Sequence, residues 1–138
     1  MPRSTLAPLA LALALAAGAC ARPVEPTNGT LAGPWGSTAA SLAVTDSAAR
    51  LLISYGTCYG AYGTMPGAIP TPIFDVGGTY TQLTGAYPGK VDYAAQFTGT
   101  LYGSRMTLTV NVPSLQRTFG PYMLTRGDST TWSQCLFP

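Results

Sequence analysis

Residues 91–112 read VDYAAQFTGTLYGSRMTLTVNV, and this stretch decides the fold. Apolar residues recur at every second position in each half of it, which is the pattern of two half-buried β-strands. Threonines and an arginine fill half of the alternate positions, so one face is predicted to be buried and the other solvated, as in an antiparallel sheet. The apolar residues are Val91, Tyr93, Ala95, Phe97 and Leu101 in the first half, and Met106, Leu108, Val110 and Val112 in the second.

The apolar positions change from odd to even numbers between the two halves, and this change constrains the connection between them. A loop of two residues, Tyr102 and Gly103, or of four residues, 101–104, keeps both apolar sets on the same face. A loop of three residues would place apolar side chains opposite polar ones. The expected hairpin therefore pairs Phe97 with Leu108.

Shorter apolar runs on both sides of this hairpin predict further strands. Asp46 and Ser47 have the chemistry of a two-residue turn, which would place Val44 opposite Ala49. The proline-rich residues 65–72 are expected to form a loop. The predicted strands, with the central hairpin included, cover residues 33–45, 49–55, 55–63, 73–83, 91–101, 106–112, 118–126 and 131–137. Residues 73–83 are expected to form one strand kinked at Gly77-Gly78, and two short strands with those glycines as the turn are the alternative.

Strands joined by short links usually lie next to each other in space, and closing the sheet removes its exposed edges. We therefore expect an all-β domain, a small antiparallel meander β-barrel of about eight strands. A two-sheet β-sandwich is the alternative. In the barrel, the last strand would pair near the first.

Composition argues against several classes of function. Only 9% of the residues are charged, compared with about 25% in an average domain. The net charge of +2 provides no basic stripe for nucleic acid, and one of the positive charges, Arg3, lies in the leader. Histidine is absent, which removes the most common general base and metal ligand.

The N-terminal residues 1–19 have the features of a signal peptide, with an apolar run over residues 6–17 and small residues before Cys20. Ala17-Gly18-Ala19-Cys20 resembles the lipobox of bacterial lipoproteins, in which the cysteine is acylated, although that pattern prefers leucine where this chain has Ala17. Cleavage after Ala19 to release a soluble, secreted protein is the alternative. Residues 20–32 would form a flexible tether and residues 33–138 the folded domain.

Three cysteines in an exported chain leave one without a partner inside the chain. If Cys20 carries lipid, Cys58 and Cys135 can form a disulfide in an oxidising compartment. Two buried thiols are the alternative interpretation of Cys58 and Cys135. A catalytic cysteine is not expected, because no histidine is present to activate it.

No catalytic, cofactor-binding or metal-binding residues can be assigned from the sequence. Asp75 and Asp92 fall on predicted strands, and nothing in the sequence brings them together as a pair of catalytic carboxylates. The segment 55–63 (YGTCYGAYG) has two interpretations: a tyrosine platform for stacking a sugar or peptide, or a twisted or bulged strand. We favour the bulged strand.

Motifs spread over most of residues 33–136 resemble a group of small bacterial lipoproteins of unknown function that have a single C-terminal β-domain. Gly33-Pro34-Trp35 is also similar to the Gly-x-Trp opening of lipocalins. The first resemblance implies a cell-envelope address and a β-domain, with no activity attached. It is carried by Pro34-Trp35-Gly36, Cys58, Phe74-Asp75-Val76, Gly78-Thr79-Tyr80, Phe97-Thr98-Gly99, residues 106–110, residues 120–125 and Cys135-Leu136.

The sequence as a whole predicts a non-catalytic lipoprotein of the cell envelope, at the periplasmic side of the outer membrane, whose barrel has a binding or structural role. Its expected partners are the membrane, through the N-terminal lipid, and a protein or a small apolar ligand. No cofactor and no nucleic acid are expected. The alternatives are a periplasmic inhibitor of a protease or lysozyme, and an enzyme with a site that the sequence does not reveal.

Overall fold

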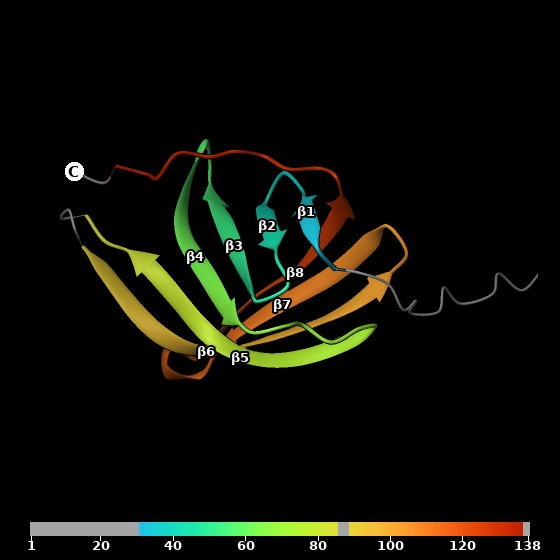
Figure 1. Cartoon of the computed structure of the whole chain (residues 1–138). Helices are drawn as coiled ribbons and strands as arrows, with labels where there is room; N and C mark the ends of the chain where they lie inside the picture. The colour runs from blue at the N-terminus through green and yellow to red at the C-terminus, as the bar shows by residue number, and fades with distance from the viewer. Residues whose placement is uncertain (1–30, 86–88, 137–138) are drawn as a thin grey trace, which may run out of the picture.

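The computed structural model describes residues 31–85 and 89–136 of the chain. They form a closed barrel of eight antiparallel strands that follow one another in chain order (Figure 1), so the predicted all-β meander barrel is confirmed. The predicted signal peptide, Cys20 and most of the tether lie outside the described residues. The strands are β1 (Gly33–Gly36), β2 (Ala40–Val44), β3 (Ala48–Tyr55), β4 (Cys58–Pro66), β5 (Ile73–Leu83), β6 (Lys90–Tyr102), β7 (Arg105–Val112) and β8 (Arg117–Arg126).

The barrel closes through β1, which pairs with β2 on one side and with the end of β8 on the other. The single strand predicted over residues 33–45 is therefore wrong: it is a hairpin of two strands. Its turn begins at Ser37, whose hydroxyl accepts hydrogen bonds from the backbone N–H groups of Ala39 and Ala40, both at 3.1 Å. Such a side-chain contact lets a serine start a turn inside an apolar run.

The strand predicted over residues 131–137 is also wrong. In its described part, up to residue 136, this segment contributes one parallel bridge, between Tyr59 and Gln134. The count of eight strands still holds, because the split of the first predicted strand offsets the loss of the last. Closure comes from β8 rather than from the C-terminal segment.

The central hairpin has the predicted faces but not the predicted register. Its loop is Gly103 and Ser104, so Phe97 faces Val110 and the predicted pairing of Phe97 with Leu108 is wrong by two residues. Gly103 has φ of 61° and is the first of the two loop residues, the position where a type II′ turn carries glycine. A shift of two residues keeps every side chain on its own face.

Two other local predictions are confirmed. The two-residue turn places Val44 opposite Ala49, and residues 73–83 form one continuous strand, β5. The segment 55–63 contains the bulge we favoured, because the register of β3 and β4 shifts between Ile53 and Ser54. Gly60 is the extra residue on β4.

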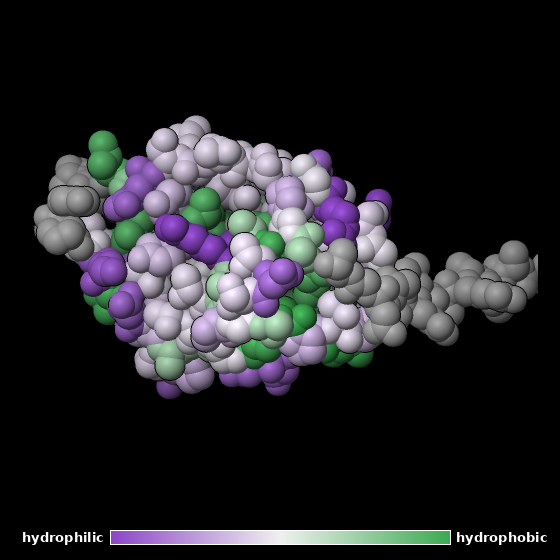
Figure 2. All heavy atoms as spheres, viewed as in Figure 1, coloured by the Kyte–Doolittle hydropathy of each residue, from purple (hydrophilic) through white to green (hydrophobic). Residues whose placement is uncertain are grey.

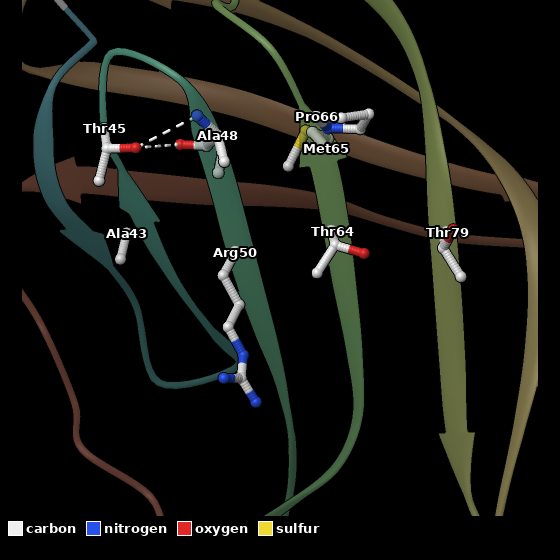
Figure 3. Close-up of a pocket in the computed structure, with 9 residues that line it drawn as sticks. Ala43, Thr45, Ala48, Arg50, Thr64, Met65, Pro66 and Thr79 are labelled. Atoms are coloured by element: carbon white, nitrogen blue, oxygen red, sulfur yellow. Dashed lines mark hydrogen bonds between the residues drawn. The ribbon is translucent and has the colours of Figure 1, made fainter.

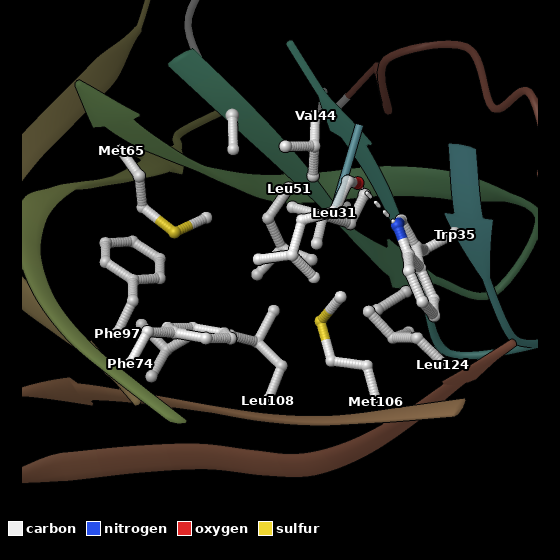
Figure 4. Close-up of a cluster of buried hydrophobic side chains, with 14 of the residues drawn as sticks. Leu31, Trp35, Val44, Leu51, Met65, Phe74, Phe97, Met106, Leu108 and Leu124 are labelled. Atoms are coloured by element: carbon white, nitrogen blue, oxygen red, sulfur yellow. Dashed lines mark hydrogen bonds between the residues drawn. The ribbon is translucent and has the colours of Figure 1, made fainter. Parts of the chain in front are cut away.

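Side chains fill the middle of the barrel (Figure 4). An eight-stranded barrel is just wide enough for this kind of filling. The outer surface is different: Figure 2 shows mostly pale and hydrophilic residues on one side of the molecule, with hydrophobic residues in small separate areas. The largest fully buried side chains are Trp35, Leu42, Leu51, Met65, Phe97, Leu101, Met106, Leu108, Val110, Val112 and Leu124.

One end of the barrel is closed by Trp35, which is fully buried. Its indole N–H donates a hydrogen bond to the carbonyl oxygen of Leu31 at 2.9 Å, and the guanidinium of Arg126 lies 4.4 Å from the centre of its ring. The chain therefore enters the barrel at this end and seals it with its first described residues.

The C-terminal segment leaves β8, crosses the top of the barrel in Figure 1 and reaches the β3–β4 turn. There the predicted disulfide between Cys58 and Cys135 is present, with a Cα–Cα distance of 5.0 Å. Two backbone hydrogen bonds of 3.0 Å, from Tyr59 N–H to Ser133 and from Cys135 N–H to Tyr59, fasten the segment beside β4. The described residues include no helix long and apolar enough to cross a membrane.

Candidate binding site at the barrel mouth

The end of the barrel opposite Trp35 contains a hollow of about 480 Å³, which we call the mouth. It lies where β3 and β5 end and where β4 and β8 begin. In Figure 1 the β5–β6 hairpin projects on this side, away from the end where the N-terminal trace leaves. The mouth is lined by Ile53, Ser54, Tyr55, Gly60, Ala61, Tyr80, Gln82, Leu83, Arg117 and Phe119.

A bulge in β8 brings one wall of the mouth into place. Leu108 pairs with Tyr122 and Val110 with Phe119, so two residues of β8, Gly120 and Pro121, lie opposite one residue of β7. In a regular strand Phe119 and Tyr122 would point to opposite faces, but the extra residue lets both pack against the barrel core. Glycine is needed here because Gly120 has φ of 93° and an added Cβ would lie 2.8 Å from the carbonyl oxygen of Leu108.

Aromatic rings form the wall that the bulge completes. Tyr80 is buried and stacks on Phe119, with ring centres 4.9 Å apart and planes inclined by 17°. Tyr93, its cross-strand neighbour on β6, lies 6.3 Å from Tyr80 between ring centres. These separations are typical of favourable aromatic pairs.

Burial acts on two phenols, Tyr80 in this wall and Tyr122 near Tyr80. It raises the pKa of Tyr80, and the positive charge of Arg117 opposes that rise. Burial, followed by the neighbouring Tyr80, raises the pKa of Tyr122. Both hydroxyls are therefore protonated at physiological pH and can donate hydrogen bonds.

The charge at the mouth is positive. Arg117 is exposed, and its guanidinium carbon lies 5.6 Å from the ring centre of Phe119. Among residues 31–85 and 89–136 it makes no ion pair. Lys90 begins β6 opposite Leu83, while the nearby carboxylate of Asp92 accepts a 2.6 Å hydrogen bond from the Thr81 hydroxyl.

The rim of the mouth includes the first of the tyrosines in segment 55–63. Tyr55 is 69% exposed and lies at the end of β3. Tyr59 and Tyr62 lie elsewhere, on the outside of β4, with their rings 6.4 Å apart and inclined by 78°. The three tyrosines therefore do not form one flat platform.

A second hollow, of about 490 Å³, lies on the outer surface across β2, β3, β4 and β5 (Figure 3). Its lining is mostly small: Ala43, Ala48, Thr64 and Thr79 are typical. Arg50 is the one charged residue, and its guanidinium lies 4.9 Å from the ring centre of Tyr62. This hollow offers fewer polar groups and no aromatic wall, so the mouth is the better candidate site.

The structure keeps the strand carboxylates apart. Asp75 pairs with Thr98 and Asp92 with Thr81 on the same β5–β6 ladder, six positions from each other. At 3.3 Å per residue this is about 20 Å, well beyond the separation in glycosidase carboxylate pairs. Asp75 instead accepts a hydrogen bond from the Gln96 side chain. No group of three potential metal-ligating acids or cysteines occurs within the described parts of the chain.

Sequence reasoning did not single out Tyr80, Arg117 or Phe119. The available signal was Gly120-Pro121 inside an apolar pattern, because a glycine or proline within a strand often marks a bulge.

The chain was also compared with known proteins. Protein-family models, curated proteins and solved structures gave no match in any of the three comparisons.

Proposed function

We propose that this chain is a non-catalytic binding protein of the bacterial cell envelope, which is anchored by lipid at Cys20 and binds a small ligand in the barrel mouth. The observation that carries the binding role is the mouth itself: an aromatic wall and an arginine around a hollow of about 480 Å³, at the end of a barrel otherwise filled by side chains. Ligand sites typically combine a mostly apolar lining with a few polar groups, and often occupy the mouths of barrels.

The lining of the mouth supports binding through two kinds of contact. Ile53, Leu83 and Phe119 offer apolar surface, whose removal from water favours association. Ser54 and Gln82 offer hydrogen-bonding groups that can orient what is bound. The filled core below them supports a shallow ligand rather than one enclosed by the barrel.

The proposed location in the cell envelope rests on the cysteines and on the predicted N-terminal signal peptide. Cys58 and Cys135 are joined, so Cys20 is the third cysteine and follows the apolar segment and small residues of an export signal. Lipid on this residue would hold the barrel at the membrane by a tether.

We expect the mass of protein extracted from the membranes of a bacterial host to equal that of a chain beginning at Cys20 plus a diacylglycerol and an amide-linked acyl group. A Cys20→Ser variant should lose that added mass and leave the membrane fraction. Intact mass spectrometry makes the measurement. An unlipidated mature chain in the wild type would contradict the anchor and favour the secreted alternative.

The binding role predicts that the mouth takes up a neutral aromatic probe. In protein of residues 20–138 carrying Cys20→Ser, which has neither the apolar export segment nor the lipid, the fluorescence of N-phenyl-1-naphthylamine should rise and saturate. Gln82→Trp places a large ring in the mouth and should abolish the rise, because Gln82 is an exposed residue of the lining.

Thr98→Trp is the matched control for that titration. It adds the same side chain to an exposed strand position in the middle of β6, away from the mouth. It should leave the probe affinity unchanged. Equal binding by wild type and Gln82→Trp, or no saturable binding at all, would refute the mouth as a binding site.

A further inference from the structure

We infer that the mouth selects small aromatic anions: the acid group of the ligand pairs with Arg117 and its flat body lies against Tyr80 and Phe119. This inference names the ligand class of the proposed binding site and rests on that proposed function. It follows from the charge at the rim, the shape of the wall and the position of Arg117 relative to that wall.

The first step is the charge. Arg117 makes no ion pair within residues 31–85 and 89–136, and its guanidinium lies against the ring of Phe119. Asp92, near the start of β6, accepts a hydrogen bond from the Thr81 hydroxyl. A guanidinium presents parallel N–H donors that match the two oxygens of a carboxylate or sulfonate. The rim therefore favours an anion.

The second step is the shape. Tyr80 and Phe119 stack on each other nearly parallel and both line the mouth, where Tyr80 is buried and Phe119 is partly exposed; the tilted ring of Tyr93 lies beside Tyr80 on β6. Offset or edge contacts with this wall suit another aromatic ring better than a branched aliphatic group. A hollow of about 480 Å³ falls within the range of sites for small organic ligands.

The third step joins the two. The same β8 segment carries Arg117 and Phe119, two residues apart, and the guanidinium lies over the ring of Phe119. A ligand whose acid group pairs with Arg117 thus has its aromatic ring next to the aromatic wall. Arg117, Tyr80 and Phe119 all line the mouth, so charge and wall belong to one site.

The experiment compares two probes that differ in charge. 8-Anilinonaphthalene-1-sulfonate is an aromatic anion, and N-phenyl-1-naphthylamine is its neutral counterpart. Both are titrated into protein of residues 20–138 carrying Cys20→Ser. Arg117→Gln should weaken binding of the sulfonate by about tenfold, the loss expected for one charge-assisted contact, and change binding of the neutral probe less than about twofold.

Arg105→Gln is the matched control, since Arg105 is also an exposed arginine but lies at the opposite end of the barrel, beside the β6–β7 turn. It removes the same charge from the whole molecule and should leave both affinities unchanged. If Arg105→Gln and Arg117→Gln weaken the sulfonate equally, net charge explains the effect and the inference is overturned.

Competition identifies the body of the ligand. 1-Naphthoate should displace the sulfonate more effectively than dodecanoate, an alkyl anion typical of lipids, and 1-naphthylmethylammonium should displace it least. Stronger displacement by dodecanoate would overturn the aromatic part of the inference. The proposed binding role can fail separately from the ligand class. If Gln82→Trp still binds both probes, the binding role is refuted. If Gln82→Trp loses both probes but Arg117→Gln has no effect, only the ligand class is overturned.

Discussion

Replacing Phe97 by alanine is expected to lower the free energy of unfolding by about 3 to 5 kcal/mol, the range for removing a buried aromatic side chain. Phe97 is fully buried at the middle of β6. Its ring occupies space left by two glycines: a Cβ built on Gly63 or on Gly78 would lie 2.6 Å or 2.9 Å from it. At these two positions β4 and β5 carry no side chain that could fill the resulting cavity.

Chemical denaturation of wild type and variant gives this quantity directly, provided that the slope with denaturant stays constant. Val91→Ala is the matched control, because Val91 lies on the same strand and in the same apolar set but is 41% exposed. It should change stability by no more than about 0.5 kcal/mol. A loss below about 1 kcal/mol for Phe97→Ala would show that the inner face of β6 is wrongly assigned.

The contrast between Phe97, which is fully buried, and Val91, which is 41% exposed, shows what an alternating pattern of apolar residues can predict. The pattern identified the inner face of the central hairpin correctly, since Phe97, Leu101, Met106 and Leu108 are all buried. The pattern could not show at which residue this face stops packing against the core. Val91 lies at the projecting end of β6, beside the mouth, where little of the barrel remains to cover it.

Register is the next level of detail, and the pattern alone does not determine it. Moving the loop from Tyr102 and Gly103 to Gly103 and Ser104 shifts the pairing by two residues and leaves both faces intact. The choice depends on the backbone of the turn, where Gly103 supplies a positive φ at the first position. Glycine occurs in both candidate loops, so composition alone did not separate them.

The ends of the sheet were predicted less well than its middle. β1 has only four residues, among them a proline, and a hydroxyl contact from Ser37 separates it from β2. Neither feature appears in a pattern of apolar residues. At the C-terminal side, residues 131–137 were predicted to form a strand, whereas the described part of this segment is held mainly by the disulfide and two backbone hydrogen bonds.

The mouth could not have been predicted from sequence, because its parts come from distant strands. Tyr80 and Phe119 meet only when β5 and β8 close around the same end of the barrel. Phe119 and Tyr122 then share a face only because of the bulge at Gly120. The sequence pattern marks the bulge as an irregularity, but it does not say which side chains the bulge redirects.

Replacing both Cys58 and Cys135 by alanine is expected to lower the free energy of unfolding by about 4 kcal/mol, since the bond closes a long loop and constrains the unfolded chain. The two cysteines are separated by 77 positions in the sequence. The variant should nevertheless keep the native fold, because β1 and β8 close the barrel upstream of Cys135. Circular dichroism in the far ultraviolet should therefore match that of the wild type.

Ser133→Ala provides the control for this variant. It alters an exposed side chain in the same segment and leaves intact both the disulfide and the backbone carbonyl that accepts the hydrogen bond from Tyr59. Its stability should stay within about 0.5 kcal/mol of the wild type. A double-cysteine variant without strand signal would mean that the bond is required to close the barrel, and a variant as stable as the wild type would mean that the C-terminal segment already constrains the chain without it.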